Sequence, residues 1–203
     1  ETVVERVIYR IIKDEATYLT ALRTGQLDIL EAIRWIAVDH LKETTPELQW
    51  NRYLATGGQF ISLRVDQKPF DDIRVRRAMN LAVNQQEIVD HFYGGHAELM
   101  AYPQHPEFGE YFEPLEAMPD AVQELFTHDP EEARRLLDEA GVPEGFSFDL
   151  QVCSCSPSHM DLVPLLESYF AQVGLKTNIQ TMEYASFLST MTTKTHGPAY
   201  LLT

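Results

Sequence analysis

The sequence predicts an α/β fold in which helices flank a mixed sheet. The clearest sign is an alternation of apolar and polar residues over 146–152, followed by helical apolar spacing over 162–173 and an apolar segment at 175–182. Strand, helix and strand in this order predict a βαβ unit with parallel strands and a right-handed crossover. Composition agrees, because 203 residues with 44% hydrophobic content can form one large core or two small ones.

The first part of the chain predicts a mixture of strands and helices. Residues 3–12 are rich in β-branched side chains, which is typical of a strand. Residues 16–23 have helical apolar spacing, and Gly25 fits the position just past a helix end. Further elements expected here are a strand at 28–30, a helix near 36–42 and an extended segment at 59–65. Gly57 and Gly58 are the best candidates for a domain boundary, so we expect parts 1–56 and 57–203.

Capping residues mark the helices of the second part. One helix face is expected from apolar residues spaced three and four apart, namely Val75, Ala78, Met79 and Ala82. Asn84 with Glu87 resembles a capping box, which predicts a helix to about Tyr93. Asp129, with a proline directly after it, predicts the start of a helix that Gly141 ends. Residues 96–127 are expected to form a long loop with a short helix near 121–125, and another helix is expected from 184 to 191.

Charge and hydropathy exclude several classes of protein. Sixteen Lys and Arg residues against 31 Asp and Glu give a formal charge of −15, which disfavours nucleic acid as a partner. No segment approaches the roughly 20 apolar residues that a membrane span needs. The chain starts without Met or a signal-peptide pattern, so we expect a mature product or an excised piece.

Few residues have the spacing of a catalytic or metal site. Cys153 and Cys155 would close a very small disulfide loop and lack further ligands at recognisable spacing, so we interpret them as ordinary thiols. The histidines are scattered, which predicts no metal site. Ser154 or Ser158 with His159 could form a nucleophile and base, although serines before a helix are also normal caps.

Several segments, in order along the chain, resemble motifs of one protein family. They are Leu-Thr-Ala-Leu-Arg-Thr-Gly-Gln-Leu-Asp at 19–28, Pro-Phe-Asp-Asp-Ile-Arg-Val-Arg-Arg-Ala at 69–78, the continuation over 80–94, Asp-Pro-Glu-Glu-Ala-Arg-Arg-Leu-Leu-Asp-Glu-Ala-Gly at 129–141, and Gln-Val-Gly-Leu-Lys at 172–176. Together they resemble the family 5 extracellular solute-binding proteins, the peptide/nickel-binding receptors of ABC importers. Arg64 stands where that family usually has Asn, and Asn84 where it has Asp.

The resemblance implies a type II periplasmic-binding-protein-like lobe and a binding protein without catalytic residues, cofactor or metal. Such receptors work outside the cytoplasmic membrane, close two hinged lobes on a solute and pass it to an ABC permease. We expect an oligopeptide or similar solute as cargo. Residues 1–56 would then end the first lobe, and residues 57–203 would begin the second.

Ligands in α/β lobes bind beyond the carboxyl ends of strands. That rule selects the turn after residues 146–152, with Ser154, Ser156 and His159 as candidate ligand-binding residues. Arg64 and Tyr102 are further candidates. Two other functions stay open: a serine hydrolase using Ser154 or Ser158 with His159, and an interaction domain that uses the aromatic loop around Tyr102.

Overall fold

The computed structural model describes residues 3–54, 58–99 and 106–202, and it divides into two compact units, residues 1–52 and 53–203. In the first unit, helices α1 (Glu15–Arg23) and α2 (Trp35–Thr44) form where the sequence predicts them. Asp14 begins α1 by accepting a hydrogen bond from the Thr17 amide at 2.8 Å, and Gly25 follows its end at φ +69°. Arg34 and Glu15 form an ion pair at 2.6 Å between the starts of the two helices.

The strands predicted at 3–12 and 28–30 are wrong for the described residues, which have no regular structure there. Val7 and Ile11 keep 66% and 92% of their surface exposed. A strand is stable only with a hydrogen-bonded neighbour, and the regular elements described in this unit are both helices. The β-branched composition therefore indicates a strand propensity, but the described residues 3–52 contain no second strand with which this segment could pair.

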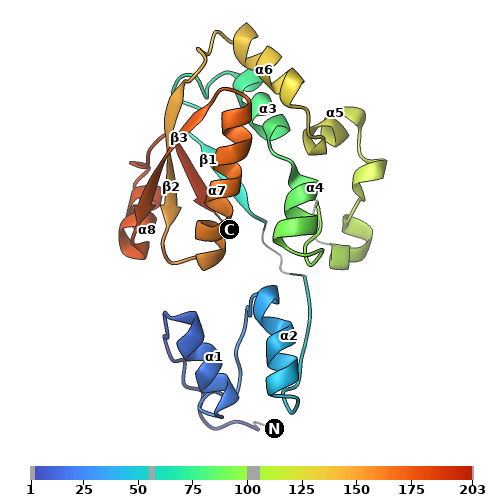
Figure 1. Cartoon of the computed structure of the whole chain (residues 1–203), viewed down its shortest axis with the longest axis vertical. Coiled ribbons are helices and arrows are strands. Elements are labelled where there is room, and N and C mark those ends of the chain that lie inside the picture. The colour runs from blue at the N-terminus through green and yellow to red at the C-terminus, as the bar shows by residue number, and fades with distance from the viewer. Residues whose placement is uncertain (1–2, 55–57, 100–105, 203) are drawn as a thin grey trace. The chain divides into compact units, whose positions relative to one another are not determined.

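The second unit confirms the α/β class, with a four-stranded mixed sheet and helices around it (Figure 1). Its elements in chain order are β1 (Phe60–Leu63), α3 (Ile73–Ala82), α4 (Gln85–Glu87), the π-helical turn η1 (Ile88–Phe92), the 3₁₀ turns η2 (Pro106–Tyr111) and η3 (Leu115–Ala117), α5 (Asp120–Gln123), η4 (Glu124–Phe126), α6 (Pro130–Glu139), β2 (Ser147–Cys153), α7 (Pro157–Gln172), β3 (Lys176–Met182), α8 (Tyr184–Thr192) and β4 (Ala199–Leu202).

Strand β4 lies between β1 and β2 in a sheet of order β1-β4-β2-β3. It pairs antiparallel with β1, Leu63 opposite Ala199, and parallel with β2, Leu150 opposite Ala199. Strands β2 and β3 are parallel and are joined through α7, which confirms the expected βαβ unit. We did not predict β4, because four residues without polar alternation give almost no strand signal.

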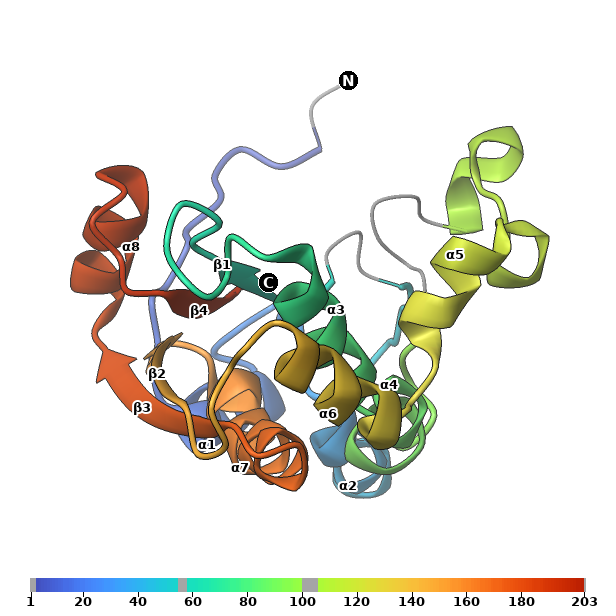
Figure 2. The ribbon, with the colours of Figure 1, turned by 90° about the horizontal axis from the view of Figure 1, so that it is seen from above.

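The core lies between one face of the sheet and helices α3, α6 and α7. The inward residues Phe148, Leu150 and Val152 of β2 are each at most 3% exposed. Phe148 makes edge-to-face contacts with Phe70 and Phe170, with ring centroids 5.6 and 5.8 Å apart. Figure 2 shows α8 on the side of the sheet away from α7. None of the helices within the described ranges is long and apolar enough to cross a membrane.

The predicted caps begin their helices as expected. Asn84 accepts a hydrogen bond from the Glu87 amide at 3.0 Å, and Asp129 accepts one from the Glu132 amide at 2.9 Å. The helix expected from Asn84 to Tyr93 does form, but after one α-helical turn it continues as the π-helical turn η1. Gly94 follows with φ +57°, a conformation that glycine adopts without a Cβ clash.

We expect Leu137→Ala in α6 to lower the free energy of unfolding by about 2–5 kcal/mol, because Leu137 is 4% exposed and its loss leaves a cavity in the core. The control is Leu188→Ala in α8, the same change at a residue that is 42% exposed, for which the loss should be much smaller. Urea unfolding of both variants measures the difference. Equal losses would contradict the assignment of α6 to the core.

Candidate functional site

A pocket of about 690 Å³ opens in the second unit between β1, α3, the α4–η1 region and α7. Its wall is mostly apolar and includes Ile61, Met79 and Leu166. Gln59 and Phe60 also line it, at the end of the sheet where β4 terminates. The side-chain oxygen of Gln59 is buried and accepts no hydrogen bond from the described part of the chain. The pocket thus combines mostly apolar walls with a few polar lining residues, as small-molecule sites commonly do.

The turn after β2 lies at the same end of the strands as this part of the pocket. Parallel pairing places the carboxyl ends of β2, β3 and β4 together. The turn connects Cys153 directly to α7, whose Leu162 lines the pocket one helical turn beyond His159. The structure therefore groups three predicted site residues, Ser154, Ser156 and His159, at the carboxyl edge of the sheet.

The hydroxyl groups of Ser154 and Ser156 both form hydrogen bonds with backbone groups. Ser154 donates to the Met182 carbonyl at 3.1 Å, and the Ser156 oxygen accepts from the His159 amide at 3.3 Å as the cap of α7. His159 is 5% exposed, and this burial lowers its pKa because the charged imidazolium loses solvation. The Ser156 contact fits the capping interpretation, the Ser154 hydroxyl is held by β3, and neither contact supports a hydrolase.

The interpretation of Cys153 and Cys155 as ordinary thiols is wrong, because the structure joins them in a disulfide. Cys153 is the last residue of β2 and Cys155 lies in the following turn, so their Cα atoms are 5.1 Å apart, within the usual disulfide range. A small loop makes the bond weakly stabilising, but it does not prevent the bond from forming.

Arg64 lies at the opposite end of the strands from this turn, beside the start of β4. It follows β1, and its amide donates to the Pro198 carbonyl at 2.9 Å, directly before β4 begins. Its guanidinium forms an ion pair with Asp66 at 2.6 Å and donates to the carbonyls of Lys194 and His196. The structure therefore does not bring Arg64 together with the other predicted residues, and its contacts join the loops that flank β1 and β4.

Other pocket residues were not predicted, and one predicted residue cannot be placed. Tyr102 lies outside the described residues. Gln59, Tyr93 and His96 line the pocket but were not among our candidates. The available signal was their position next to glycine pairs, at residues 57–58 and 94–95, a sequence pattern that favours turns.

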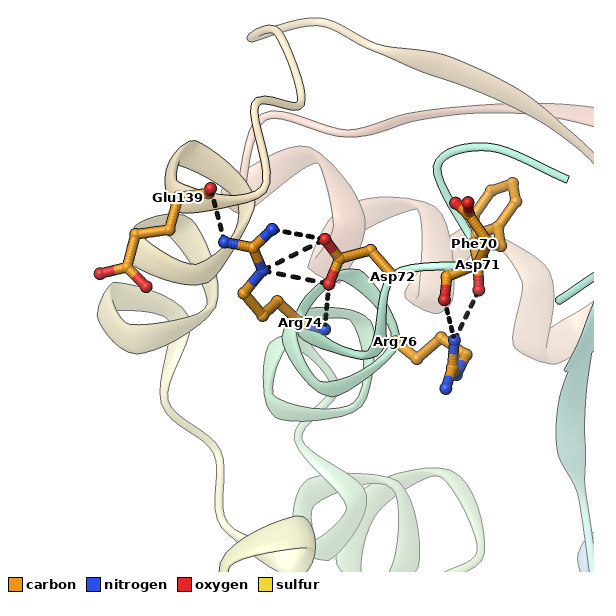
Figure 3. Close-up of polar contacts among 6 residues, drawn as sticks. All are labelled: Phe70, Asp71, Asp72, Arg74, Arg76 and Glu139. Carbon is orange, nitrogen blue, oxygen red and sulfur yellow. Dashed lines mark hydrogen bonds and ion pairs between the residues drawn. The ribbon is translucent and has the colours of Figure 1, made fainter.

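The Pro-Phe-Asp-Asp motif forms a polar network at the start of α3, shown in Figure 3. Asp72 accepts a hydrogen bond from the Arg74 amide at 2.8 Å and forms an ion pair with the Arg74 guanidinium at 2.6 Å. Arg74 also donates to the Glu139 carbonyl at 2.7 Å, which connects α3 to the end of α6. Arg76 donates to the Phe70 and Asp71 carbonyls. The motif therefore orients helices, and the charges of Asp72 and Arg74 are engaged within the fold.

The second unit has a type II periplasmic-binding-protein-like fold. A solved structure with the same fold is the ABC transporter-associated periplasmic binding protein DppA from Helicobacter pylori in complex with the peptide STSA. The two share 24% sequence identity and a TM-score of 0.75, over 95% of this chain and 35% of that one.

The chain belongs to the bacterial extracellular solute-binding proteins, family 5, because the model of the family's middle part matches residues 1–202. It is 29% identical over 192 residues to di/tripeptide-binding protein 1 of Pseudomonas aeruginosa, covering 93% of this chain and 34% of that protein. It is 27% identical over 190 residues to heme-binding protein A of Haemophilus influenzae, covering 92% and 33%. The chain thus spans about a third of these curated relatives. Members of this family bind solutes for transport and are not enzymes.

We expect acid to weaken the second unit partly through Asp72. Hydrogen bonds from the Arg74 side chain and amide lower the pKa of Asp72 from 3.8 to about 2. A lowered carboxyl pKa stabilises the fold above the ordinary pKa, and this contribution disappears as pH falls from about 3.8 to about 2.

Thermal unfolding measured across this pH interval should therefore show a shallower fall in melting temperature for Asp72→Asn than for the native protein. Asp71→Asn, a change at the exposed neighbouring residue, is the control and should keep the native slope. If both variants followed the native curve, Asp72 would not be a source of the acid sensitivity.

Proposed function

We propose that this chain is the central part of a receptor that captures small solutes outside the cytoplasmic membrane and delivers them to an ABC permease. The observation that carries the proposal is the family match, which covers residues 1–202. The relatives are about three times as long, so solute capture would belong to the whole protein. The outward location follows the family description, since its members are extracellular solute-binding proteins.

We also propose that residues 1–56 end the first lobe of this receptor and that residues 57–203 begin the second. The division of the structure into units of 1–52 and 53–203 supports a boundary in this region. In such a receptor the solute binds the closed arrangement of the lobes more tightly than the open one, and this difference drives closure.

Oligopeptides are the cargo class that we favour. The apolar walls of the pocket suit side chains, and its polar lining residues, among them Asn80 and Gln85, carry amide groups that can hydrogen-bond to a peptide backbone. Among the relatives, the name of di/tripeptide-binding protein 1 states peptides as its ligand, while that of heme-binding protein A states heme. Heme is therefore the competing cargo that an experiment has to separate from peptides.

The turn from Ser154 to His159 is the part of this chain that we propose to face the cargo, together with Tyr102. Its position at the carboxyl ends of β2, β3 and β4 supports this, because ligands of open α/β sheets bind beyond that edge. For Arg64 we favour a positioning role, since its guanidinium contacts Asp66 and two loop carbonyls at the other edge.

The full-length protein should bind di- and tripeptides, and thermal unfolding with a panel of ligands tests this. A ligand at 100 times its dissociation constant stabilises a protein by about 2.7 kcal/mol, which gives a readily measured rise in melting temperature. Hemin is the matched competitor. Stabilisation by hemin alone would overturn the peptide assignment, and no stabilisation by either ligand would argue against the receptor function.

Ser154→Trp should weaken peptide binding by about tenfold or more, equivalent to about 1.4 kcal/mol, because an indole at the turn would occupy the proposed cargo space. The control is Ser147→Trp, the same change at an exposed residue at the other end of β2. Calorimetric titration of both full-length variants measures the difference. Equal affinities for the two variants would remove the turn from the binding site.

A further inference from the structure

The disulfide at the end of β2 joins two cysteines with very different access to solvent. Cys153 is 2% exposed, and its backbone lies in β2 opposite Met182 of β3. Cys155 is exposed in the turn. A dissolved thiol can therefore approach Cys155, while the strand and its neighbours cover Cys153.

This disulfide contributes little to holding the fold together. The stabilisation that a disulfide gives through the unfolded state grows with the length of the loop it closes, and here the two cysteines are only two residues apart. The Ser154 amide and hydroxyl already bind the Met182 carbonyl, so hydrogen bonds fix the turn independently of the sulfur bond. The bond can therefore open without unfolding the core.

The backbone around Cys153 favours its role as the leaving group in an exchange reaction. The Cys155 amide donates to the Cys153 sulfur at 3.2 Å, and this contact stabilises negative charge on that sulfur. The sixteen-residue helix α7 begins at Pro157, two residues after Cys155, and its amino end also favours a nearby thiolate. Burial acts in the opposite direction on Cys153, so the released thiolate takes up a proton from water.

We propose that the Cys153–Cys155 disulfide is a thiol-exchange site, at which a cysteine-containing peptide or other small thiol becomes attached to Cys155. The thiolate of the incoming molecule attacks the Cys155 sulfur and forms a new disulfide with it. The Cys153–Cys155 bond breaks, and its electron pair goes to Cys153, which is protonated. The incoming thiol is oxidised to the mixed disulfide while Cys153 is reduced, so no other oxidant is required.

The reaction is reversible because Cys153 stays beside the mixed disulfide. Its thiolate form can attack Cys155, release the attached thiol and restore the original bond. The chemistry depends on this turn alone and stands apart from the cargo proposal, so each can fail without the other.

Reduced glutathione, a tripeptide thiol, is the probe for this reaction. The full-length protein, purified without reductant, is incubated with the probe and then with iodoacetamide. Peptide mass spectrometry should show the tripeptide on Cys155 and the alkyl group on Cys153. S-methylglutathione is the matched control, and it should add nothing because its sulfur cannot attack. Dithiothreitol should remove the attached tripeptide.

Two single variants test the difference in access without the exchange reaction. In Cys153→Ser the remaining thiol of Cys155 should react with iodoacetamide in the folded protein about ten times faster than Cys153 does in Cys155→Ser. Three results for the native protein would overturn the proposal even if a variant failed to fold. They are free thiols at both positions before treatment, attachment at Cys153, or a disulfide that glutathione opens only after unfolding.

Discussion

The second unit depends on the pairing of strand β4 with its two neighbours. This strand pairs antiparallel with β1 on one side and parallel with β2 on the other, so it alone joins β1 to the β2–β3 pair among the described residues. Its inward residues Ala199 and Leu201 are at most 2% exposed and complete the core. Because β4 comes after every other element of the unit, the β1–β4 pair closes the whole segment between them into one long loop, which costs chain entropy.

The sheet also decides which parts of the chain can act together. Parallel pairing brings the carboxyl ends of β2, β3 and β4 to one edge, where the turn from Cys153 to His159 lies near the pocket end formed by Gln59. Arg64 is held at the other end of the strands by Asp66 and two carbonyls. The family motif around Asp72 has a structural task, since its ion pair with Arg74 connects α3 and α6. The Asp72–Arg74 part of the motif thus serves the fold, while its continuation, including Asn80 and Tyr93, lines the pocket.

The turn after β2 combines two features with separate consequences. Its serines satisfy backbone groups of β3 and α7, which makes the turn well defined in position. Its disulfide places one covered and one accessible sulfur next to each other. Because hydrogen bonds hold the turn in place, thiol exchange at the disulfide need not change the position of the turn.

Local patterns in the sequence determined the helices of this protein, the caps Asn84 and Asp129, and the parallel β2–α7–β3 unit, because capping and periodicity act within a few residues. The motifs also determined the family. Tertiary structure decided the rest. The segment 3–12 has strand composition but no partner, while β4 has little composition signal and becomes a central strand because two partners surround it. The separation of Arg64 from Ser154 likewise depends on how strands align, since hydrogen-bonded pairing and contact between distant segments are settled only when the whole sheet assembles.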